Sequence, residues 1–587
     1  ELKWPAGFMY NARYFDRSFL TSLEREDWIK EAKELQTSLT DAVIEESIRK
    51  WPGEIYDLHG EEIIKKLKAR REKLVEYGLN HYYFLSRAVN VVGSDKHELF
   101  EVNYLDNDQV EVRVSKIKKD GEVVKEIFHR TFVSGETKEI RLYGLDGDDQ
   151  FKLKGNGNGG IKIRIISGKG DDKLASEAKA KPLIYAKPKG IEIEAGSKFR
   201  DRKSSNPAVN EYNRKEFKYN VLAPLLFANY NIDDGIFLGG GFFATTYGFR
   251  KDPYKSQHLF LGSYAINTSS FNFQYTGKYT GIIGHWNGEI DVNAKSPNFV
   301  NNFFGLGNES RFDKNIKDNP SIDVERSIDY YRMRFKEWSL NLKLRRSIGQ
   351  FGFVGLGPSF QSIEIEDPDK DRFVKDFAAS FPEPILEKNK SFAGANITWG
   401  VDNRNDPKLT TRGLYFEQSS RWMDDINSSS GSFGSYNASL SLFQSFKLPA
   451  KLTFAFRASG GINTGGYQFY QSQILDGRTE LRGFRKTRFY GDSKLVFNNE
   501  VRLKLGDIRS YILPASIGIT AFYDVGRVWY EDAPGIDPSS TSGASSIWHK
   551  GYGGGIWLTP FNLAVVSVEV ANSVEGTLGY FRLGFLF

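Results

Sequence analysis

One arginine and two carboxylates are the residues whose types and spacing point most clearly to a functional cluster. Arg482 lies in the segment Leu481-Arg482-Gly483-Phe484, and Glu500 and Asp524 follow in the next two apolar-rich stretches. A carboxylate on a strand whose other face is apolar needs water or a cation beside it, and Arg482 supplies a guanidinium. Ion pairing is therefore the chemistry that these three residue types allow.

Two predicted strands carry these acids. Apolar and polar residues alternate with the period of a β-strand between 494 and 505 and again between 516 and 529. Glu500 and Asp524 both fall on the polar side of their strands. We therefore expect the two acids to face the same side of a sheet, with Arg482 reaching them from the preceding segment.

No other residues have the spacing of a catalytic centre. The seven His are scattered along the chain, and neither a Ser/His/Asp arrangement nor a metal-ligand spacing is persuasive. We expect no enzyme activity and no cofactor, with one alternative, which is calcium.

The candidate calcium site consists of two Gly- and Asp-rich turns at 144–149 and 167–172. Clustered carboxylates on such turns are typical calcium ligands, and the turns faintly resemble those of calcium-binding β-rolls. Two copies are too few for a roll, so the sequence favours ordinary tight turns over a metal site. The carboxylates concerned are those of Asp146, Asp148, Asp149, Asp171 and Asp172.

Composition is compatible with a membrane β-barrel. The 587 residues include 45 Phe, 29 Tyr and 57 Gly but no Cys, which excludes disulfides and thiolate chemistry. No apolar run reaches the ~18 residues of a membrane helix. The polar mean hydropathy of -0.46 does not exclude a barrel, because only alternate strand residues face lipid. A net charge of +6 on this length gives no indication of nucleic-acid binding.

Alternating stretches continue from 217 to 587. We count about sixteen, an even number as single-chain bacterial barrels require. Long connectors at 295–328, 366–390, 463–494 and 530–547 follow odd-numbered stretches, whereas connectors after even-numbered stretches are mostly short. The pattern predicts an all-β transmembrane barrel of about 16 antiparallel strands. The first strand begins and the last strand ends at the side of the short turns, which is the periplasmic side.

Three regions precede this barrel. Residues 1–95 have the pattern of a small helical region, residues 96–195 that of a β-sandwich-like or roll domain, and residues 196–216 that of a polar linker. All three are expected in the periplasm, where the barrel begins. The chain opens at Glu1 without Met or a signal peptide, so we expect a mature product, a trimmed chain or a fragment, with a domain missing upstream as one alternative.

The residues around Arg482 resemble a known family. Together with 499–502 and 522–529, the segment 481–484 is similar in order and spacing to three blocks of the outer-membrane assembly factors. This bacterial surface antigen superfamily includes BamA and the two-partner secretion transporters. Its Arg-Gly-Phe motif lies on the sixth extracellular loop, which folds into the barrel lumen, and its Arg pairs with acids on the next two strands. The resemblance implies a lumen clamp of Arg482, Gly483, Phe484, Glu500, Asp524 and Gly526.

A weak seam is a further expectation. The first strand, at 218–230, must close against the last, at 578–587. Pro224 lacks an amide donor, and Gly579 and Gly584 weaken packing in the last strand, which ends on the aromatic residue Phe587. A weak seam could open sideways and accept an incoming strand. The alternative is that Pro224 only ends pairing at a rim.

The resemblance implies insertion or translocation of polypeptides through this seam at the Gram-negative outer membrane. Expected partners are outer-membrane lipids, unfolded or secreted polypeptide clients, and periplasmic or lipoprotein subunits, with no nucleic acid. The alternatives are a static anchor that displays a periplasmic domain or surface loops such as 303–308, and a transporter for lipid or a small solute. The POTRA domains usual in this family are not evident here, and neither are the Asp/His blocks of the phosphoesterase domain that some relatives carry upstream.

Overall fold

The structure is a computed structural model that divides into two compact units, Glu1–Lys218 and Tyr219–Phe587. It describes residues 9–587 except 107, 158–159, 232–234, 367–370, 380–385, 387–388, 428–430, 449, 511–512, 531–545 and 562–563. Among the helices of these described residues, none has both the length and the apolar character needed to cross a membrane.

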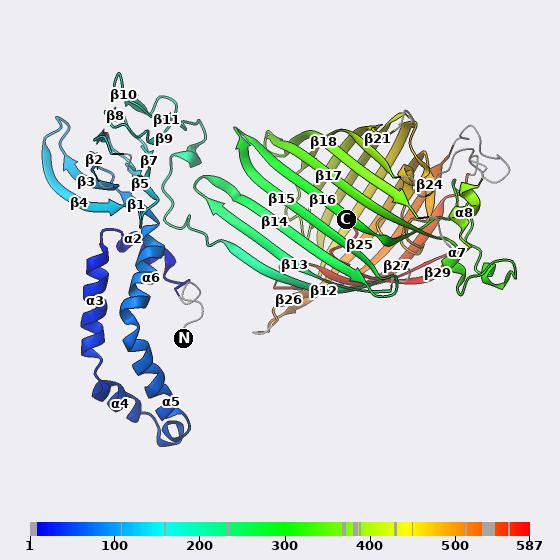
Figure 1. The fold of residues 1–587 in the computed structure, drawn as a ribbon, viewed down its shortest axis with the longest axis horizontal. Coiled ribbons are helices and arrows are strands. Elements are labelled where there is room, and N and C mark those ends of the chain that lie inside the picture. Colours follow the sequence, from blue (N-terminus) through cyan, green and yellow to red (C-terminus); the bar gives the residue numbers. More distant parts are fainter. Residues whose placement is uncertain are drawn as a thin grey trace. The chain divides into compact units, whose positions relative to one another are not determined.

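The first unit begins with helices joined by short turns (Figure 1). Thr40 caps one of them, because its side chain accepts a hydrogen bond from the Val43 amide. Pro52 precedes the next helix, whose buried Ile64 packs against Ile44 and Ile48. The helices are α2 (Arg13–Phe19), α3 (Arg25–Ser38), α4 (Asp41–Arg49), α5 (Gly53–Glu72) and α6 (Leu74–Ser86).

The rest of this unit is a two-sheet roll. The five-stranded sheet has the order β1 (Ala88–Val92), β5 (Glu139–Tyr143), β7 (Lys162–Ile166), β9 (Leu183–Tyr185) and β11 (Arg200–Asp201). The six-stranded sheet has the order β10 (Ile191–Ile193), β8 (Asp172–Ser176), β6 (Gln150–Lys154), β2 (Glu98–Tyr104), β3 (Gln109–Ile117) and β4 (Val123–Val133). From β5 onward, consecutive strands alternate between the two sheets, and each strand pairs in parallel with the next strand of its own sheet. The chain therefore coils around one apolar core.

This coiling corrects two expectations. The sequence shows two copies of the turn, too few for a calcium-binding roll, but a third turn, 93–98, precedes β2 in the same way that 144–149 and 167–172 precede β6 and β8. The antiparallel β3 and β4 separate the first coil from the second, which hides the repeat in the sequence. Residues 88–92, assigned to the helical region, form β1, because they complete the sheet beside β5.

The second unit is a 16-stranded antiparallel sheet that curves into a barrel (Figure 1), as the alternating pattern predicts. Each strand pairs with its neighbour along the chain. The first eight strands are β12 (Val221–Asn231), β13 (Gly235–Gly248), β14 (Lys251–Ala265), β15 (Ser270–Ile283), β16 (Trp286–Asn302), β17 (Arg332–Ile348), β18 (Gly352–Ile365) and β19 (Lys390–Asp402). The others are β20 (Gly413–Asp425), β21 (Ser432–Leu448), β22 (Ala450–Gly465), β25 (Ser493–Ile508), β26 (Ala515–Trp529), β27 (His549–Pro560), β28 (Val566–Ser573) and β29 (Gly576–Leu583).

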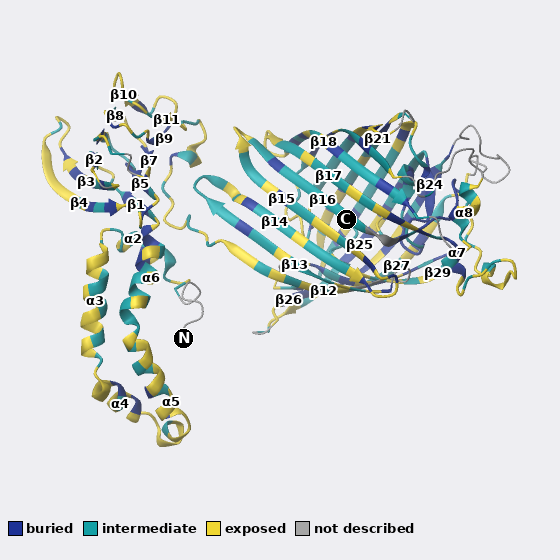
Figure 2. Ribbon diagram, viewed as in Figure 1, coloured by how far each residue is buried: buried dark blue, intermediate teal, exposed yellow. Residues whose placement is uncertain are grey.

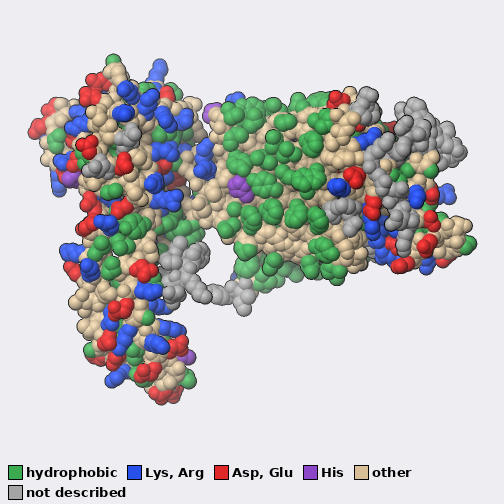
Figure 3. Space-filling model, viewed as in Figure 1, with side chains coloured by type: hydrophobic (Ala, Val, Ile, Leu, Met, Phe, Trp, Pro, Cys, Tyr) green, Lys and Arg blue, Asp and Glu red, His purple; other side chains and the backbone are tan. Residues whose placement is uncertain are grey.

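An apolar band covers the outside of the barrel. Figure 3 shows hydrophobic side chains over the strands and charged side chains gathered beyond one end of them. On β17 the exposed Trp338 and Leu342 lie between Lys336 and Arg346 along the same face. Large exposed side chains of this kind favour contact with lipid.

The two ends of the barrel differ, and we call them the loop end and the turn end. At the turn end β13 and β14 are joined by residues 249–250 alone, whereas at the loop end the connector between β16 and β17 spans 303–331. The loops contain α7 (Ser327–Tyr330), α8 (Phe373–Ala378) and a small sheet of β23 (Gln473–Leu475) and β24 (Phe489–Gly491). Most of the predicted loop at 530–547 lies outside the described residues.

Aromatic and aliphatic residues fill the loop end. Buried residues gather around β24 in Figure 2. Phe303 and Leu306 are 0% and 3% exposed, and Leu306 forms a parallel bridge with Tyr490. The alternative in which 303–308 is displayed as a surface loop is therefore wrong, because this segment packs inside the barrel mouth.

Candidate functional site: a clamp inside the barrel

The connector between β22 and β25 folds into the barrel and buries Arg482 completely. Its guanidinium donates two hydrogen bonds to Asp524, from Nε to Oδ2 at 2.7 Å and from Nη2 to Oδ1 at 2.9 Å. The Arg482 main-chain amide also donates to Asp524 Oδ2 at 3.2 Å. This two-pronged arrangement fixes both the position and the orientation of the loop, because it matches the planar fork of arginine.

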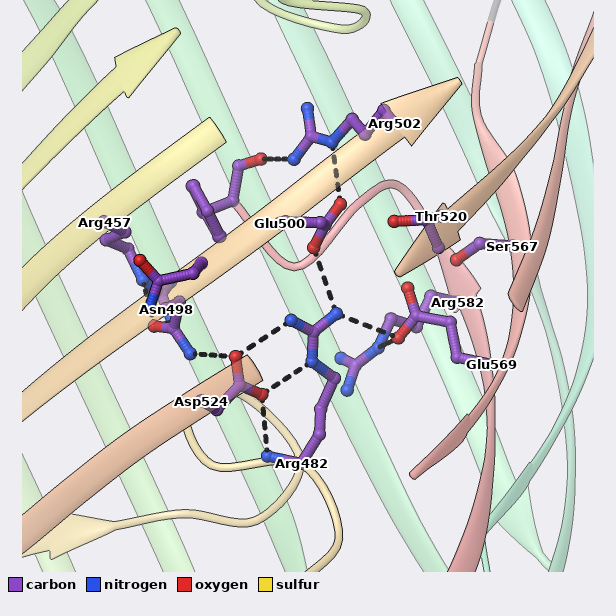
Figure 4. A network of polar contacts seen from close by, with 12 residues as sticks. Arg457, Arg482, Asn498, Glu500, Arg502, Thr520, Asp524, Ser567, Glu569 and Arg582 are labelled. Carbon is purple, nitrogen blue, oxygen red and sulfur yellow. Dashed lines mark hydrogen bonds and ion pairs between the residues drawn. The ribbon is translucent and has the colours of Figure 1, made fainter. Parts of the chain in front are cut away.

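Two further carboxylates complete the shell around this guanidinium (Figure 4). Nη1 of Arg482 donates to Glu500 at 3.0 Å and to Glu569 on β28 at 3.4 Å. The Phe522 ring centroid lies 3.4 Å from the guanidinium carbon, which adds a cation–π contact. Glu500, Asp524 and Glu569 are 2%, 0% and 0% exposed, so little solvent screens these charges.

Additional polar residues extend the cluster along the inner wall. Arg502 donates to Glu500 at 2.7 Å, and Arg582 donates to Glu569 at 3.2 Å. Asn498 donates to Asp524 at 2.8 Å and accepts from Arg457. The cluster places charges without a reactive nucleophile or an adjacent general base, so its chemistry is that of a structural or switching contact.

Glycines create the space for this loop. Gly551 on β27 stands opposite Asp524 in the strand register, and a Cβ at Gly551 would lie 1.7 Å from the Arg482 carbonyl oxygen. Gly483 adopts φ +94, and a Cβ there would lie 2.9 Å from the Asn572 carbonyl oxygen. Gly526 leaves room for the Leu475 side chain of β23, whose nearest atom would lie 3.1 Å from a Cβ added at Gly526.

The segment after Arg482 is fastened to β28 and β29. The Gly483 amide donates to the Tyr580 hydroxyl at 2.8 Å, and the Ser573 hydroxyl donates to the Gly483 carbonyl at 2.6 Å. Phe484 is 1% exposed, and its ring lies 5.5 Å from that of Phe489. The loop and the last two strands therefore form one connected body.

The structure thus brings together Arg482, Glu500 and Asp524, with Gly483, Phe484 and Gly526 around them. The sequence pattern did not predict the roles of Glu569, Arg502, Arg582, Asn498 and Gly551. A signal for Glu569 was present, since it is an acid between apolar residues of an alternating strand, like Glu500. Gly551 gave none, because its role depends on a distant carbonyl group.

A match to a known protein family covers most of the barrel. A model of the Omp85 superfamily domain matches residues 259–577, more than half of the chain. The chain belongs to the Omp85 superfamily. This confirms the family expected from the motif around Arg482, and with it a β-barrel of the Gram-negative outer membrane with a role in protein insertion or secretion. Proteins of this superfamily are generally non-enzymatic.

Several solved structures are similar to this Omp85 chain. BamA from Haemophilus ducreyi lacking POTRA domains 1-3 shares 13% identity, with a TM-score of 0.42 over 62% of this chain and 71% of that one. CdiB from Acinetobacter baumannii shares 12% identity, with a TM-score of 0.39 over 62% of this chain and 60% of that one. CdiB from Escherichia coli shares 12% identity, with a TM-score of 0.40 over 62% of each chain. No curated protein matches the sequence.

The seam of the Omp85 barrel differs in part from its prediction. Pro224 and Gly579 lie on the two strands that meet there, β12 and β29. The last strand, however, ends at Leu583 and does not continue to Phe587. Gly584 adopts φ +117, a left-handed conformation that turns the following residues into the lumen. Gly584 is therefore a bend and not a gap in strand packing, and Phe587 is not part of the seam.

The carboxylates of the candidate calcium turns mainly bind backbone amides. Asp148 accepts from the Asp171 amide at 3.0 Å, and Asp149 accepts from the Glu98 amide at 2.9 Å. Asp146 lies 3.6 Å from the Lys169 ammonium. Within the described residues, no group of three or more His, Cys, Asp or Glu side chains has the arrangement of a metal site. Calcium binding stays the untested alternative to ordinary tight turns.

Two of these aspartates are fully buried in the roll. Asp149 and Asp172 are 0% exposed, and the Asp149 amide donates to Asp172 Oδ1 at 3.0 Å. Burial raises the pKa of Asp149 to about 9 and that of Asp172 to about 7. For Asp149 the backbone hydrogen bond from Glu98 opposes this change in pKa, whereas the nearby carboxylates of Asp172, Glu98 and Asp148 add to it.

We expect the stability of the roll to fall as the pH rises. An unfolded aspartate ionises near pH 4, whereas folded Asp149 holds its proton up to about pH 9, so unfolding releases a proton throughout this window. Asp149→Asn keeps an uncharged group there and should raise the free energy of unfolding at pH 9 by at least about 1 kcal/mol relative to wild type. Thermal melting of residues 1–218 within the full chain, from pH 5 to pH 9, measures this effect. Asp106→Asn, at an exposed position outside these turns, is the matched control, and an equal pH slope in Asp149→Asn and wild type would contradict the expectation.

Proposed function

We propose that this protein inserts polypeptide strands into the outer membrane through the seam between β12 and β29. The observation that carries the proposal is the unpaired edge of both strands. In the part of the chain that the structure describes, β12 pairs only with β13 and β29 pairs only with β28, although β12 and β29 lie next to each other. In lipid, an unpaired strand edge is costly and ready to accept another strand.

The composition of β12 adds support. Pro224 supplies no amide to either neighbour. On the same outward face, Leu222 and Leu226 are 74% and 92% exposed, so this edge strand presents apolar side chains to the bilayer. A client strand that pairs with β12 would meet both open hydrogen-bonding groups and an apolar surface, the β-augmentation mode of binding.

The loop end favours insertion over passage through the lumen. Arg488 is 3% exposed and links three segments, because its guanidinium contacts Glu575 at 2.5 Å and the Ser310 carbonyl at 2.7 Å. Asn308 accepts from the Val528 amide at 3.1 Å. A polypeptide that crossed here would have to displace this buried aromatic and charged packing, whereas a lateral route leaves it intact.

The proposal assigns the loop end to the cell exterior and the unit of residues 1–218 to the periplasm. The barrel strands are sixteen in number, so the first and last begin and end on the side of the short turns, as is usual for periplasmic turns. In this arrangement the helices and the roll would receive unfolded clients or periplasmic and lipoprotein subunits, and outer-membrane lipids would contact the apolar band.

A cysteine cross-link tests the seam. The chain contains no Cys, so one cysteine in β12 and one in β29 give a single disulfide across the edge strands. We expect oxidation to lower the rate of client insertion into proteoliposomes at least tenfold and reductant to restore it. The control is a pair across β21 and β22, which already share a full ladder. Insertion that continues unchanged in the oxidised seam variant would favour a static anchor or a solute transporter.

A further inference from the structure

Two large aromatic side chains of α2 are exposed on the surface of the first unit. Phe15 and Phe19 are 61% and 59% exposed, and their ring centroids lie 4.7 Å apart. They are four residues apart in the helix, so they share one face of it. We call these two rings the α2 patch. Single exposed apolar residues are common on protein surfaces, whereas adjoining large ones indicate a contact surface.

The opposite face of α2 is fastened to its unit. Asp16 is 9% exposed, and its carboxylate lies 3.0 Å from Nε2 of His81 on α6. The guanidinium carbon of Arg17 lies 4.9 Å from the ring centroid of Phe84, also on α6. The α2 patch therefore cannot turn toward the interior of its unit without breaking these contacts, and another partner has to cover it.

The same helix contacts the segment that leads into the membrane. The Phe217 ring centroid lies 3.7 Å from the Arg17 guanidinium carbon, and the Phe84 ring meets it edge-on at 5.9 Å. β12 begins at Val221, four residues after Phe217, and Leu222 is already 74% exposed on its outer face. Four extended residues span at most about 14 Å. Phe217, and α2 with it, is therefore tethered close to the bilayer surface at which β12 begins.

Cations surround this connection. Three exposed cations lie among the eight residues before β12, which contain Glu216 as their single acid: Arg214, Lys215 and Lys218. At the start of α2 the Arg13 guanidinium carbon lies 3.8 Å from the Tyr10 ring centroid. Cations beside aromatic rings are typical of segments at a lipid–water interface, where rings enter the headgroup region and cations meet phosphate. A second copy of this surface would instead bring like charges together.

We propose that α2 is a membrane-contact helix. Phe15 and Phe19 enter the headgroup region of the leaflet at which β12 begins, and Arg13 with the cations of 214–218 meets the phosphates of anionic phospholipid. This inference needs a barrel in a membrane, which the family match supplies, but not the insertion of clients, so it goes beyond the proposed function. The contact gives the first unit a second attachment beside the chain connection and limits its rotation about residues 217–221.

Fluorescence quenching of the full chain in proteoliposomes tests this contact. The chain has no Cys, so Asn11→Cys gives one labelling site, exposed and four residues before Phe15. The matched control is Asp57→Cys beside Leu58, which is 75% exposed on α5; Figure 1 places the α4–α5 turn at the other end of the helices from α2. Interfacial helices reach only ~5–10 Å into the bilayer, so we expect phospholipid with a spin label near the headgroup to lower the fluorescence at position 11 about twofold. A spin label at the acyl end should lower it less, and position 57 should not be quenched.

Two further comparisons separate lipid from other partners. The variant with Phe15→Ser and Phe19→Ser, labelled at position 11, should lose the quenching, whereas Leu35→Ser with Leu58→Ser, at two other exposed apolar positions, should keep it. Replacing part of the phosphatidylcholine by phosphatidylglycerol should increase it. Nanodiscs that hold one chain each exclude a second copy, so quenching that vanishes there would assign the patch to self-association and overturn the lipid contact. Equal quenching at positions 11 and 57, or in the double Ser variant and its parent, would overturn it as well.

Discussion

Arg482→Ala is expected to destabilise the barrel by about 3–5 kcal/mol, the range found when one partner of a buried ion pair is removed. The substitution removes the guanidinium that balances the buried acids Asp524, Glu500 and Glu569. Arg502 and Arg582 still contact the two glutamates, but Asp524 loses its only ion pair among the described residues. It also releases the inner end of the loop, since the bidentate contact with Asp524 is lost. Thermal unfolding of the purified barrel in detergent measures the loss of stability.

Two control variants sharpen this expectation. Arg478→Ala removes an arginine of the same loop that is not part of the clamp and should change the melting temperature little. Arg482→Lys keeps the charge but cannot form the two-pronged contact, so we expect it to fall between wild type and Arg482→Ala. Melting of Arg482→Ala at the wild-type temperature would refute a stabilising clamp. Normal stability together with lost client insertion would instead indicate a moving part.

Gly551→Ala is expected to lower the stability of the barrel nearly as much as Arg482→Ala does, although it adds a single methyl group. Its Cβ would lie 1.7 Å from the Arg482 carbonyl oxygen. This carbonyl belongs to a loop that is held by hydrogen bonds on both sides, so it cannot move aside as a flexible side chain does. The loop must therefore shift away from β27, which lengthens the contacts of Arg482 with Asp524. We expect a loss of about 3 kcal/mol, at the upper end for overpacking a well-packed site.

Protease accessibility of the loop 466–492 measures this shift directly. In wild type the segment around Arg482 and Phe484 is buried, whereas in Gly551→Ala we expect new cleavage there at low protease concentration. Gly506→Ala is the matched control, because an added Cβ in this other strand glycine meets no atom within 4 Å. An uncleaved loop with wild-type melting in Gly551→Ala would show that β27 does not limit the loop position.

Alternation in the sequence was sufficient to predict the barrel. All sixteen strands lie at the positions of the alternating stretches, because the inward or outward direction of each side chain is fixed by local backbone geometry. The same alternation placed Glu500 and Asp524 together on the polar face of their strands. The rule on buried charge required water or a cation beside them, with Arg482 as one available cation, and the resemblance of 481–484 to the family motif implied that Arg482 is their partner.

The roll and the last residues, 584–587, show where local patterns were insufficient. Parallel coils pair strands that are far apart in the sequence, and the β3–β4 hairpin separates the first coil from the second, so the repeat was not recognised. For the last residues, the alternation of Phe581, Leu583, Phe585 and Phe587 predicted one continuous strand. The conformation of Gly584 changes this direction, and a glycine in a sequence does not reveal its φ angle.

The sequence by itself determined the strand number and the inner and outer faces of the barrel, because both follow from a period of two. The resemblance of 481–484 to the family motif added the central arginine with two of its acids. Only the tertiary structure decided that Glu569 is the third acid, that Gly551 makes room for the loop, and that residues 585–587 contact Arg502. The physical reason is that these contacts join strands far apart in the sequence. Their separation and their offset along the barrel axis depend on the register and tilt of all the strands in the closed sheet.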